Sequence, residues 1–280
     1  MKVGLVLEGG AMRGMYTAGV IDSFLDHELH VDGIIGVSAG ACFGCNLFSR
    51  QRGRVLRYNT RFMRDPRNVS LRSLITTGDI VNREFAYYVI PTQYDIFDEE
   101  AFEAHGGAYW VVVTNVETGE AEYMQMHNLL RDIEMMRASA SMPFCSRMVD
   151  LDGKKYLDGG IADSIPVRQA LKMGFDKVIV VLTQPLSYRK EPMNRHLIRA
   201  FYRKYPNLCR TLEERHDRYN AQVEEVVRLE KEGKIFVIRP DEALDIKRLE
   251  KNPDVLARVH GIGLADGEKT MAALKEYLAR

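Results

Sequence analysis

A chain of 280 residues can bury one large core, and a composition of 46% hydrophobic and 28% charged residues excludes disordered, collagen-like and disulfide-scaffold proteins. Basic and acidic residues both number 39, so the chain carries no net positive charge that would favour nucleic-acid binding. The four scattered cysteines, the glycine-interrupted N-terminus and the absence of a long apolar run predict a cytoplasmic protein that spans no membrane.

Short apolar strands alternate with helical patterns along the chain, which predicts a mostly parallel sheet with helices on both faces. A buried strand at 3–7 precedes a helix at 15–29, and a second strand at 33–37 leads into another helix after Ser38. Further elements are predicted as strands at 109–114, 121–126, 177–183 and 235–238, and as helices at 129–139, 167–173 and 253–278.

This α/β pattern predicts a single domain over residues 1–280, because one domain of this length is ordinary and no repeat or low-complexity segment divides the chain. The residues that suggest chemistry lie between about 3 and 180. Residues 190–280, with further helices and a strand, are expected to pack on that core.

The second strand ends in a G-x-S-x-G pattern, in which Gly36 and Gly40 flank Ser38. In such a nucleophile elbow a sharp strand-to-helix turn presents the serine hydroxyl, and a Cβ at either glycine would crowd the turn. The N–H of Ala39, at the start of the next helix, would add to an oxyanion hole. A glycine-rich turn without catalytic function matches the same five residues, so the pattern alone leaves both interpretations open.

A second glycine-rich loop, residues 8–14, follows the first strand and precedes the first helix. Backbone N–H groups at a helix N-terminus bind anions, and an acyl-transfer enzyme needs such donors for its tetrahedral oxyanion. The alternative is a Rossmann-like nucleotide-binding protein, because Gly9, Ala11 and Gly14 fit a degenerate G-x-A-x-x-G phosphate loop.

Loop and elbow together resemble the patatin-like phospholipase family, whose loop reads D-G-G-G-x-R-G before a G-x-S-x-G elbow. Here Glu8 replaces the aspartate and Ala11 the third glycine. Neither change removes a backbone N–H, so the resemblance implies an oxyanion hole at Gly9, Gly10 and Ala11. Arg13 matches the loop arginine of the family.

Two later segments continue this resemblance in the family's order, the small-residue run 138–143 and the D-G-G run 158–160. The resemblance implies a three-layer α/β/α patatin-like fold and a Ser–Asp dyad, in which Asp158 accepts the Ser38 proton with no histidine between them. An acyl enzyme on Ser38 would then be hydrolysed by water that Asp158 activates. Burial of the carboxylate would raise its proton affinity towards that of a base.

A conventional Ser–Asp–His triad is the rival arrangement, and His260 would complete it in the chain order of α/β-hydrolases. In that fold the elbow usually follows several strands, whereas here one strand precedes it. Cys42 and Cys45 form a C-x-x-C inside the predicted helix, which favours buried thiols. No His, Cys, Asp or Glu cluster has metal-ligand spacing, so neither a metal nor a diffusible cofactor is expected.

Positive charge is concentrated in two segments of this neutral chain. Residues 50–72 hold eight arginines and one acid, and residues 188–210 hold seven bases and one acid. The first segment is either a solvated surface or a site for anionic headgroups. The second predicts a helix that either lies on an anionic membrane surface or packs its apolar face on the core, because bases flank an apolar face of Leu197, Ile198, Phe201, Tyr202 and Tyr205.

These patterns predict a serine hydrolase that cleaves carboxylic esters of lipids, with phospholipids and lysophospholipids as the expected class. A lipid ester is the expected partner and nucleic acid is not. The motifs specify neither the acyl chain, nor the headgroup, nor the oligomeric state.

Overall fold

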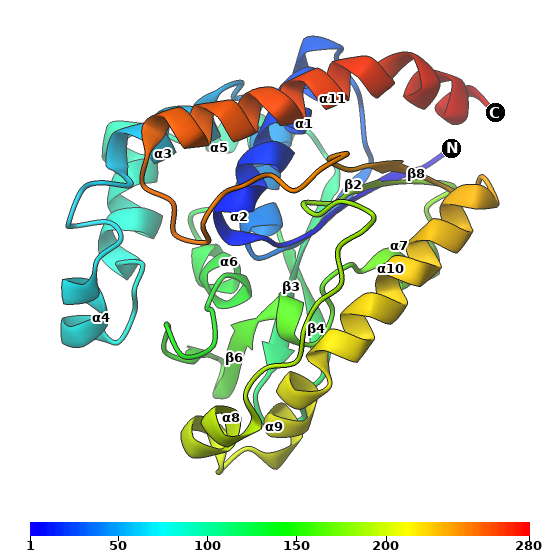
Figure 1. Cartoon of the computed structure of the whole chain (residues 1–280). Helices are drawn as coiled ribbons and strands as arrows, with labels where there is room; N and C mark the ends of the chain where they lie inside the picture. The colour runs from blue at the N-terminus through cyan, green and yellow to red at the C-terminus, as the bar shows by residue number, and fades with distance from the viewer.

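A twisted sheet of eight strands lies at the centre of the computed structural model, which describes residues 1–280 (Figure 1). The strands are β1 (Val3–Leu7), β2 (Gly33–Val37), β3 (Ala108–Asn115), β4 (Ala121–Met126), β5 (Val149–Leu151), β6 (Lys154–Asp158), β7 (Lys177–Val181) and β8 (Ile235–Ile238). Their order is β5-β6-β3-β2-β1-β7-β8, and β4 also pairs with β3. The five strands from β3 to β8 in this order pair in parallel, which confirms the predicted mostly parallel sheet, while β4, β5 and β6 are antiparallel to their neighbours.

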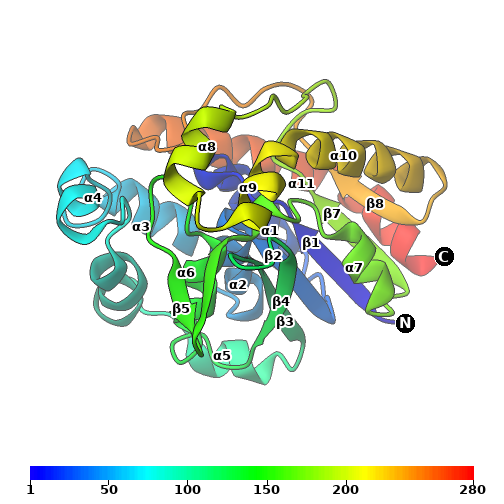
Figure 2. The same cartoon turned by 90° about the horizontal axis from the view of Figure 1, so that it is seen from below.

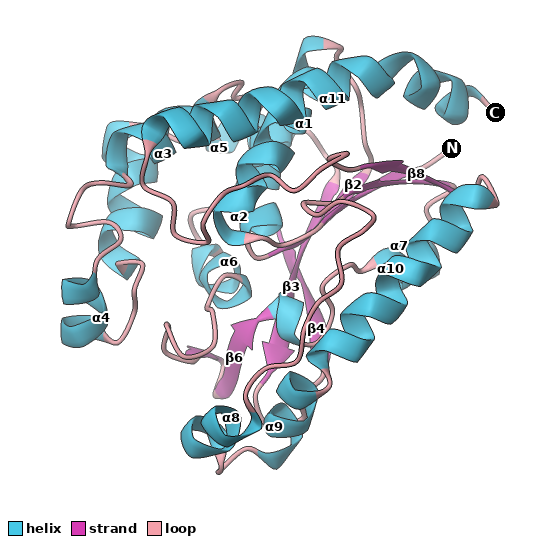
Figure 3. Cartoon of the chain, viewed as in Figure 1, coloured by secondary structure: helices cyan, strands magenta, loops and turns pink.

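Helices cover both faces of this sheet (Figure 3), so the expected three-layer α/β/α arrangement is confirmed. They are α1 (Gly14–Asp26), α2 (Ala39–Phe48), α3 (Arg54–Phe62), α4 (Leu71–Thr77), α5 (Glu99–Ala104), α6 (Ile133–Ser139), α7 (Val167–Lys172), α8 (Arg195–Tyr202), α9 (Pro206–Glu213), α10 (Arg215–Lys231) and α11 (Pro253–Ala279), with short 3-10 turns at Ala11–Arg13 and Gly159–Ile161 and a π-helix at Glu84–Tyr94. In Figure 1, α11 (red) and α10 (yellow) lie on opposite sides of the sheet. Both chain ends lie on the same side of the molecule (Figure 2).

Side chains of β1 alternate between two hydrophobic cores, as the two-residue period of a strand requires. Leu5 and Leu7 join a large cluster with residues of α1, α2 and α11. Val6 points to the other face and joins a second cluster with residues of α7 and α10. Every position of β1 and β2 is buried, which is typical of parallel strands covered on both faces.

The last helix, α11, packs directly against the first, α1 (Figure 1). A Cβ on Gly263 would overlap the carbonyl oxygen of Tyr16, so only glycine permits this approach of the two backbones. Buried His260 of α11 hydrogen-bonds Asp22 of α1 at 2.8 Å. Both ends of the chain therefore contribute to one core, and the single domain over residues 1–280 stays a prediction from the sequence.

Several helix boundaries differ from those predicted. The helix expected at 129–139 begins only at Ile133, because the Asp132 carboxylate accepts hydrogen bonds from the N–H groups of His127 and Asn128 and holds a turn there. The helix expected from residue 15 to 29 ends at Asp26, and Glu28 has a left-handed φ of 49°.

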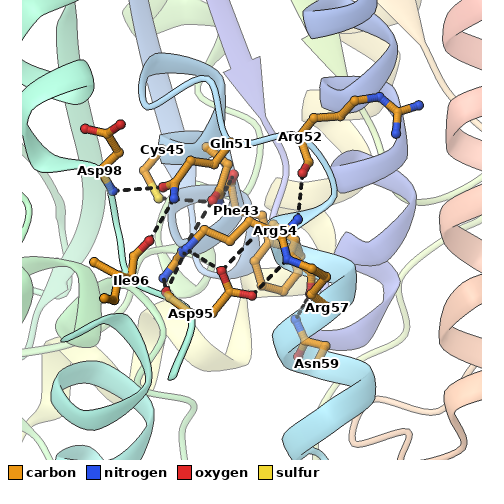
Figure 4. A network of polar contacts seen from close by, with 12 residues as sticks. Phe43, Cys45, Gln51, Arg52, Arg54, Arg57, Asn59, Asp95, Ile96 and Asp98 are labelled. Atoms are coloured by element: carbon orange, nitrogen blue, oxygen red, sulfur yellow. Dashed lines mark hydrogen bonds and ion pairs between the residues drawn. The ribbon is translucent and has the colours of Figure 1, made fainter. Parts of the chain in front are cut away.

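Arginines of the first basic segment are largely engaged within the protein. Arg54 and Arg57 pair with Asp95, and Arg54 also donates to the Asp95 carbonyl oxygen at 2.7 Å (Figure 4). Gln51 of the same loop bonds the backbone of residues 96 and 98. This network fixes the start of α3, so Arg54 and Arg57 have a structural role.

The second basic segment forms α8 and the start of α9, and the apolar residues of α8 are only partly buried. Ile198 and Tyr202 are buried, while Leu197 and Phe201 are 46% and 60% exposed. Tyr205 lies beyond the helix end. The helix therefore packs on the core with one face and presents two large apolar side chains to solvent. None of the helices is both long and apolar enough to cross a membrane.

Candidate active site

Ser38 occupies a strained turn between β2 and α2, with φ 53° and ψ −121°. A positive φ is unusual for a residue with a side chain, and strained backbone conformations cluster at active sites. A Cβ on Gly36 would lie 2.5 Å from the Cα of Ala41, and one on Gly40 would lie 2.5 Å from the Leu7 carbonyl oxygen. The turn therefore requires both glycines, as the elbow pattern predicts.

The sheet register brings Asp158 to this turn. Val37, the last residue of β2, lies opposite Val112 of β3, and Asp158, the last residue of β6, lies opposite the next residue, Val113. Strand β4 pairs with one edge of β3, and β2 and β6 pair with successive parts of the other edge. Because β6 runs antiparallel to β3, the ends of β2 and β6 meet at this point. The Ser38 hydroxyl donates a hydrogen bond to Asp158 Oδ2 at 2.7 Å.

The Asp158 carboxylate is buried, with 5% of the residue exposed. Its Oδ1 accepts a hydrogen bond from the Gly160 N–H at 2.8 Å. Burial raises the pKa of Asp158, and the positive charge of Arg215 and the hydrogen bond from Ser38 offset part of this shift. Arg215 is held nearby because its Nε donates to the Gly160 carbonyl oxygen at 2.6 Å. A carboxyl group in this setting is a stronger base than a solvated one.

The small-residue segment 138–143 supports both members of the pair. The hydroxyl of buried Ser139 accepts the Ser38 N–H at 3.0 Å, and the Ser141 carbonyl oxygen accepts the Asp158 N–H at 2.9 Å. Sequence reasoning recognised this segment only through a family resemblance and missed what the two serines do. Both contacts join residues far apart in the chain, so no local sequence signal could have revealed them.

The loop after β1 lies against Ser38. A Cβ on Gly9 would be 3.0 Å from the Ser38 Cβ, and the N–H groups of Gly9 and Gly10 have no hydrogen-bond acceptor within the protein. Ala11 has a φ of 48° and lines the same cavities as Ser38. The Arg13 side chain reaches the second of these cavities, where its Nε is buried without a partner.

Glu8, which replaces the family's aspartate, turns away from the reacting hydroxyl. Its Oε2 accepts the Thr183 N–H at 2.6 Å, and its Oε1 accepts the Tyr219 hydroxyl at 2.7 Å. These bonds tie the end of β1 to the segment after β7 and to α10. Glu8 therefore has a structural role at the start of the loop.

Two cavities meet at Ser38. The first, of about 1010 Å³ including the part open to solvent, is lined by 25 residues of which 19 are hydrophobic, and Ala39 and Cys42 are among them. The second, of about 930 Å³, holds Asp158 and the loop residues Gly9 and Gly10. An apolar chamber beside a polar one is an arrangement that suits an amphipathic ligand.

No histidine contacts Ser38 or Asp158 by a hydrogen bond. His260 is bonded to Asp22 at the α1–α11 interface, so the structure does not assemble the rival triad. Cys42 and Cys45 are free thiols inside α2, and burial raises the pKa of both, as the interpretation as packing residues requires. No group of three or more His, Cys, Asp or Glu side chains is arranged to hold a metal ion.

A family model described as patatin-like phospholipase matches residues 5–171, which include the loop, the elbow and the aspartate segment. The chain belongs to the patatin-like phospholipase family. This assignment replaces the Rossmann-like interpretation of the loop. A second model, described as a domain of unknown function (DUF6363), matches residues 205–279, so this patatin-like protein carries a distinct C-terminal segment.

Relatives of this patatin-like chain include the uncharacterized protein YjjU of Escherichia coli (strain K12), 31% identical over 66% of this chain and 52% of that protein. Lysophospholipase NTE1 of Debaryomyces hansenii is 29% identical over 69% of this chain and 12% of that protein. The chain thus spans about half of the first relative and a small part of the second. The crystal structure of VipD from Legionella pneumophila aligns with 97% of this chain and 67% of its own, with 13% identity and a TM-score of 0.47.

Proposed function

We propose that this protein hydrolyses carboxylic esters of lipids through Ser38 and Asp158. The observation that carries the proposal is the 2.7 Å hydrogen bond from the Ser38 hydroxyl to a buried carboxylate, at the point where an apolar cavity opens. A serine is a weak nucleophile by itself, so it needs an adjacent base to accept its proton. Asp158 is in position to be that base without a histidine.

In the first step Asp158 Oδ2 takes the Ser38 proton as the serine oxygen attacks the ester carbonyl carbon. The negative charge that forms on the carbonyl oxygen needs preorganised donors. The free N–H groups of Gly9 and Gly10 are the first candidates. Ala11 lines both cavities beside Ser38, whereas Ala39 lines the apolar cavity and Arg13 the polar one. When the C–O bond breaks, protonated Asp158 returns its proton to the alcohol oxygen that leaves.

The second step frees the acyl group. Water enters where the alcohol left, Asp158 accepts one of its protons, and the resulting hydroxide attacks the acyl enzyme. Collapse of the second tetrahedral intermediate releases the fatty acid and returns the proton to Ser38. Atoms and charges balance without a diffusible cofactor.

The apolar cavity indicates the substrate class, because its hydrophobic lining suits an acyl chain better than a polar group. The names of the fungal relatives, lysophospholipases, support phospholipids or lysophospholipids as substrates. A cytoplasmic location and contact with an anionic membrane surface remain predictions from the sequence.

Replacing Ser38 with alanine tests the proposal, because the change removes only a hydroxyl from the turn. We expect hydrolysis of a soluble short-chain ester to fall by about 10⁴-fold or more, with the thermal unfolding profile retained. Ser187→Ala removes an exposed hydroxyl in the loop after β7 and is the matched control. Activity of Ser38→Ala within tenfold of the unmodified protein would identify another nucleophile.

A further inference from the structure

Four positively charged side chains line the second cavity beside Ser38, and none of them forms an ion pair. Arg13, Lys190, Arg215 and Arg248 come from four separate parts of the chain. The only protein acceptor among their side-chain hydrogen bonds is the Gly160 carbonyl oxygen, which Arg215 uses. Elsewhere in the protein most partly buried arginines are paired with acids, for example Arg137 with Glu134.

The two acids of this cavity do not neutralise these charges through contacts. Both oxygens of Glu8 accept hydrogen bonds from Thr183 and Tyr219, and both oxygens of Asp158 accept from Ser38 and Gly160. The cavity therefore has an excess of donors and of positive charge. A bound anion would supply the acceptors that these side chains lack.

The pKa of Lys190 shows the effect of placing these positive charges together. Burial lowers its pKa to about 7, and the charges of Arg215, Arg13 and Arg248 act in the same direction against the opposite effect of Glu8. The Nε of Arg13 is buried without a partner. Arg13, Lys190 and Arg215 are partly buried, and Lys190 Nζ lies 4.3 Å from the centre of the Tyr219 ring, which compensates only part of the burial. Partly buried cations without an acidic partner are destabilising, so a bound anion would stabilise this cavity.

The position of this cationic cavity beside Ser38 indicates which anionic group would bind there. Ser38 and Ala11 line both cavities. A lipid ester with its acyl chain in the apolar cavity and its carbonyl carbon at Ser38 must extend its alcohol portion into the cationic cavity. We infer that this cavity binds a phosphate on the alcohol portion of the substrate, so that the protein prefers anionic lysophospholipids or phospholipids; the inference rests on the proposed function.

Zwitterionic headgroups fit this cavity less well. A quaternary ammonium beside the phosphate would be repelled by the four cations, and both nearby carboxylates are already engaged. Three of the cations, Lys190, Arg215 and Arg248, lie outside residues 5–171, and two lie within the second family match at 205–279. The C-terminal segment would thus add headgroup selectivity to the patatin-like core.

The test compares three soluble substrates with the same acyl chain: octanoyl lysophosphatidate, monooctanoylglycerol and octanoyl lysophosphatidylcholine. We expect kcat/KM for the lysophosphatidate to exceed that for each of the others by about tenfold or more. Lys190→Gln/Arg248→Gln should bring the three values to within about threefold of one another, chiefly through a higher KM for the lysophosphatidate. Arg72→Gln/Lys172→Gln removes the same charges from exposed positions on α4 and α7 and should keep the preference.

Arg248 is exposed, so Arg248→Gln should leave the fold intact. This single variant tests the cavity even if the replacement of Lys190 destabilises the protein. Equal kcat/KM for all three substrates, with hydrolysis that still requires Ser38, would overturn the headgroup inference and leave the proposed function standing. Inhibition by inorganic phosphate without any preference for lysophosphatidate would assign the cavity to free phosphate and also overturn it. Failure of Ser38-dependent hydrolysis with every ester would overturn the proposed function itself.

Discussion

Substitutions of two single residues, Asp158 and His260, distinguish the dyad mechanism from the triad mechanism. Asp158→Asn keeps the size of the side chain but removes its capacity to accept the Ser38 proton, so we expect a loss of about 10² to 10⁴ in kcat. His260→Gln retains a donor for Asp22 at the α1–α11 interface and should keep most of the rate. Steady-state kinetics on a soluble ester measures both. A comparable loss for His260→Gln would favour a histidine-mediated mechanism.

The environment of Asp158 also predicts the pH dependence. Only the deprotonated carboxylate can act as the base, so kcat/KM should fall as the pH falls through its pKa. Because burial raises this pKa, the acidic limb should lie above the ordinary aspartate value of about 3.9. Arg215→Gln removes the charge that opposes the shift, so the limb should move to higher pH, measured with an uncharged ester. Movement to lower pH would contradict this assignment of Arg215.

Motifs in the sequence identify some of these residues and not others. Ser38 and Asp158 lie in short patterns with glycines at fixed offsets, because the backbone around them admits few alternatives. Ser139 and Arg215 contact distant parts of the chain, and Lys190 reaches the cavity only through the fold. Nothing in their local sequence distinguishes these residues from ordinary surface or helix residues. The supporting contacts of the site could therefore be found only from the fold.

Alanine substitutions at two glycines of α11 should have opposite effects on the free energy of unfolding. Gly263→Ala places a methyl group against the backbone of Tyr16, so the free energy of unfolding should fall by about 1–3 kcal/mol. Gly261→Ala adds a methyl group in open space and should raise it by up to about 1 kcal/mol through better helix propensity. Urea unfolding measures both. Equal effects would mean that α1 and α11 are not in backbone contact.

Periodicity predicted the buried strands and the last helix well, because each has a continuous or regularly spaced apolar pattern. It missed α10, whose 17 residues bury only Tyr219, Val223, Val226 and Leu229 beneath a charged surface. It also missed β5 and β6, since a three-residue strand and its partner are defined by long-range pairing with β3 rather than by composition. These missed elements carry Arg215 and Asp158.

The protein as a whole carries no net charge, but α8 presents exposed apolar residues beside basic ones on its surface. Arg195 and Arg199 pair with Glu213, so the predicted contact with anionic membranes would rely on Leu197 and Phe201 as much as on charge. Replacing Leu197 and Phe201 with serine should weaken binding to anionic vesicles by about tenfold or more, because each CH₂ group buried in the membrane contributes about 0.8 kcal/mol.

Co-sedimentation with vesicles measures this binding, and Leu171→Ser, at an exposed position on α7, is the control. Binding to anionic vesicles should exceed binding to neutral ones and weaken as salt is added. Equal binding to both vesicle types, or none, would show that α8 does not contact a membrane.

In the mechanism that we propose, Ser38 is the nucleophile and Asp158 activates it without a histidine. Fluorophosphonate labelling of the intact protein, followed by mass mapping of the modified residue, tests both roles. We expect one adduct, on Ser38, that forms far more slowly in Asp158→Asn and at the normal rate in Ser187→Ala. An adduct on another residue, or labelling of Ser38 at an unchanged rate in Asp158→Asn, would contradict it.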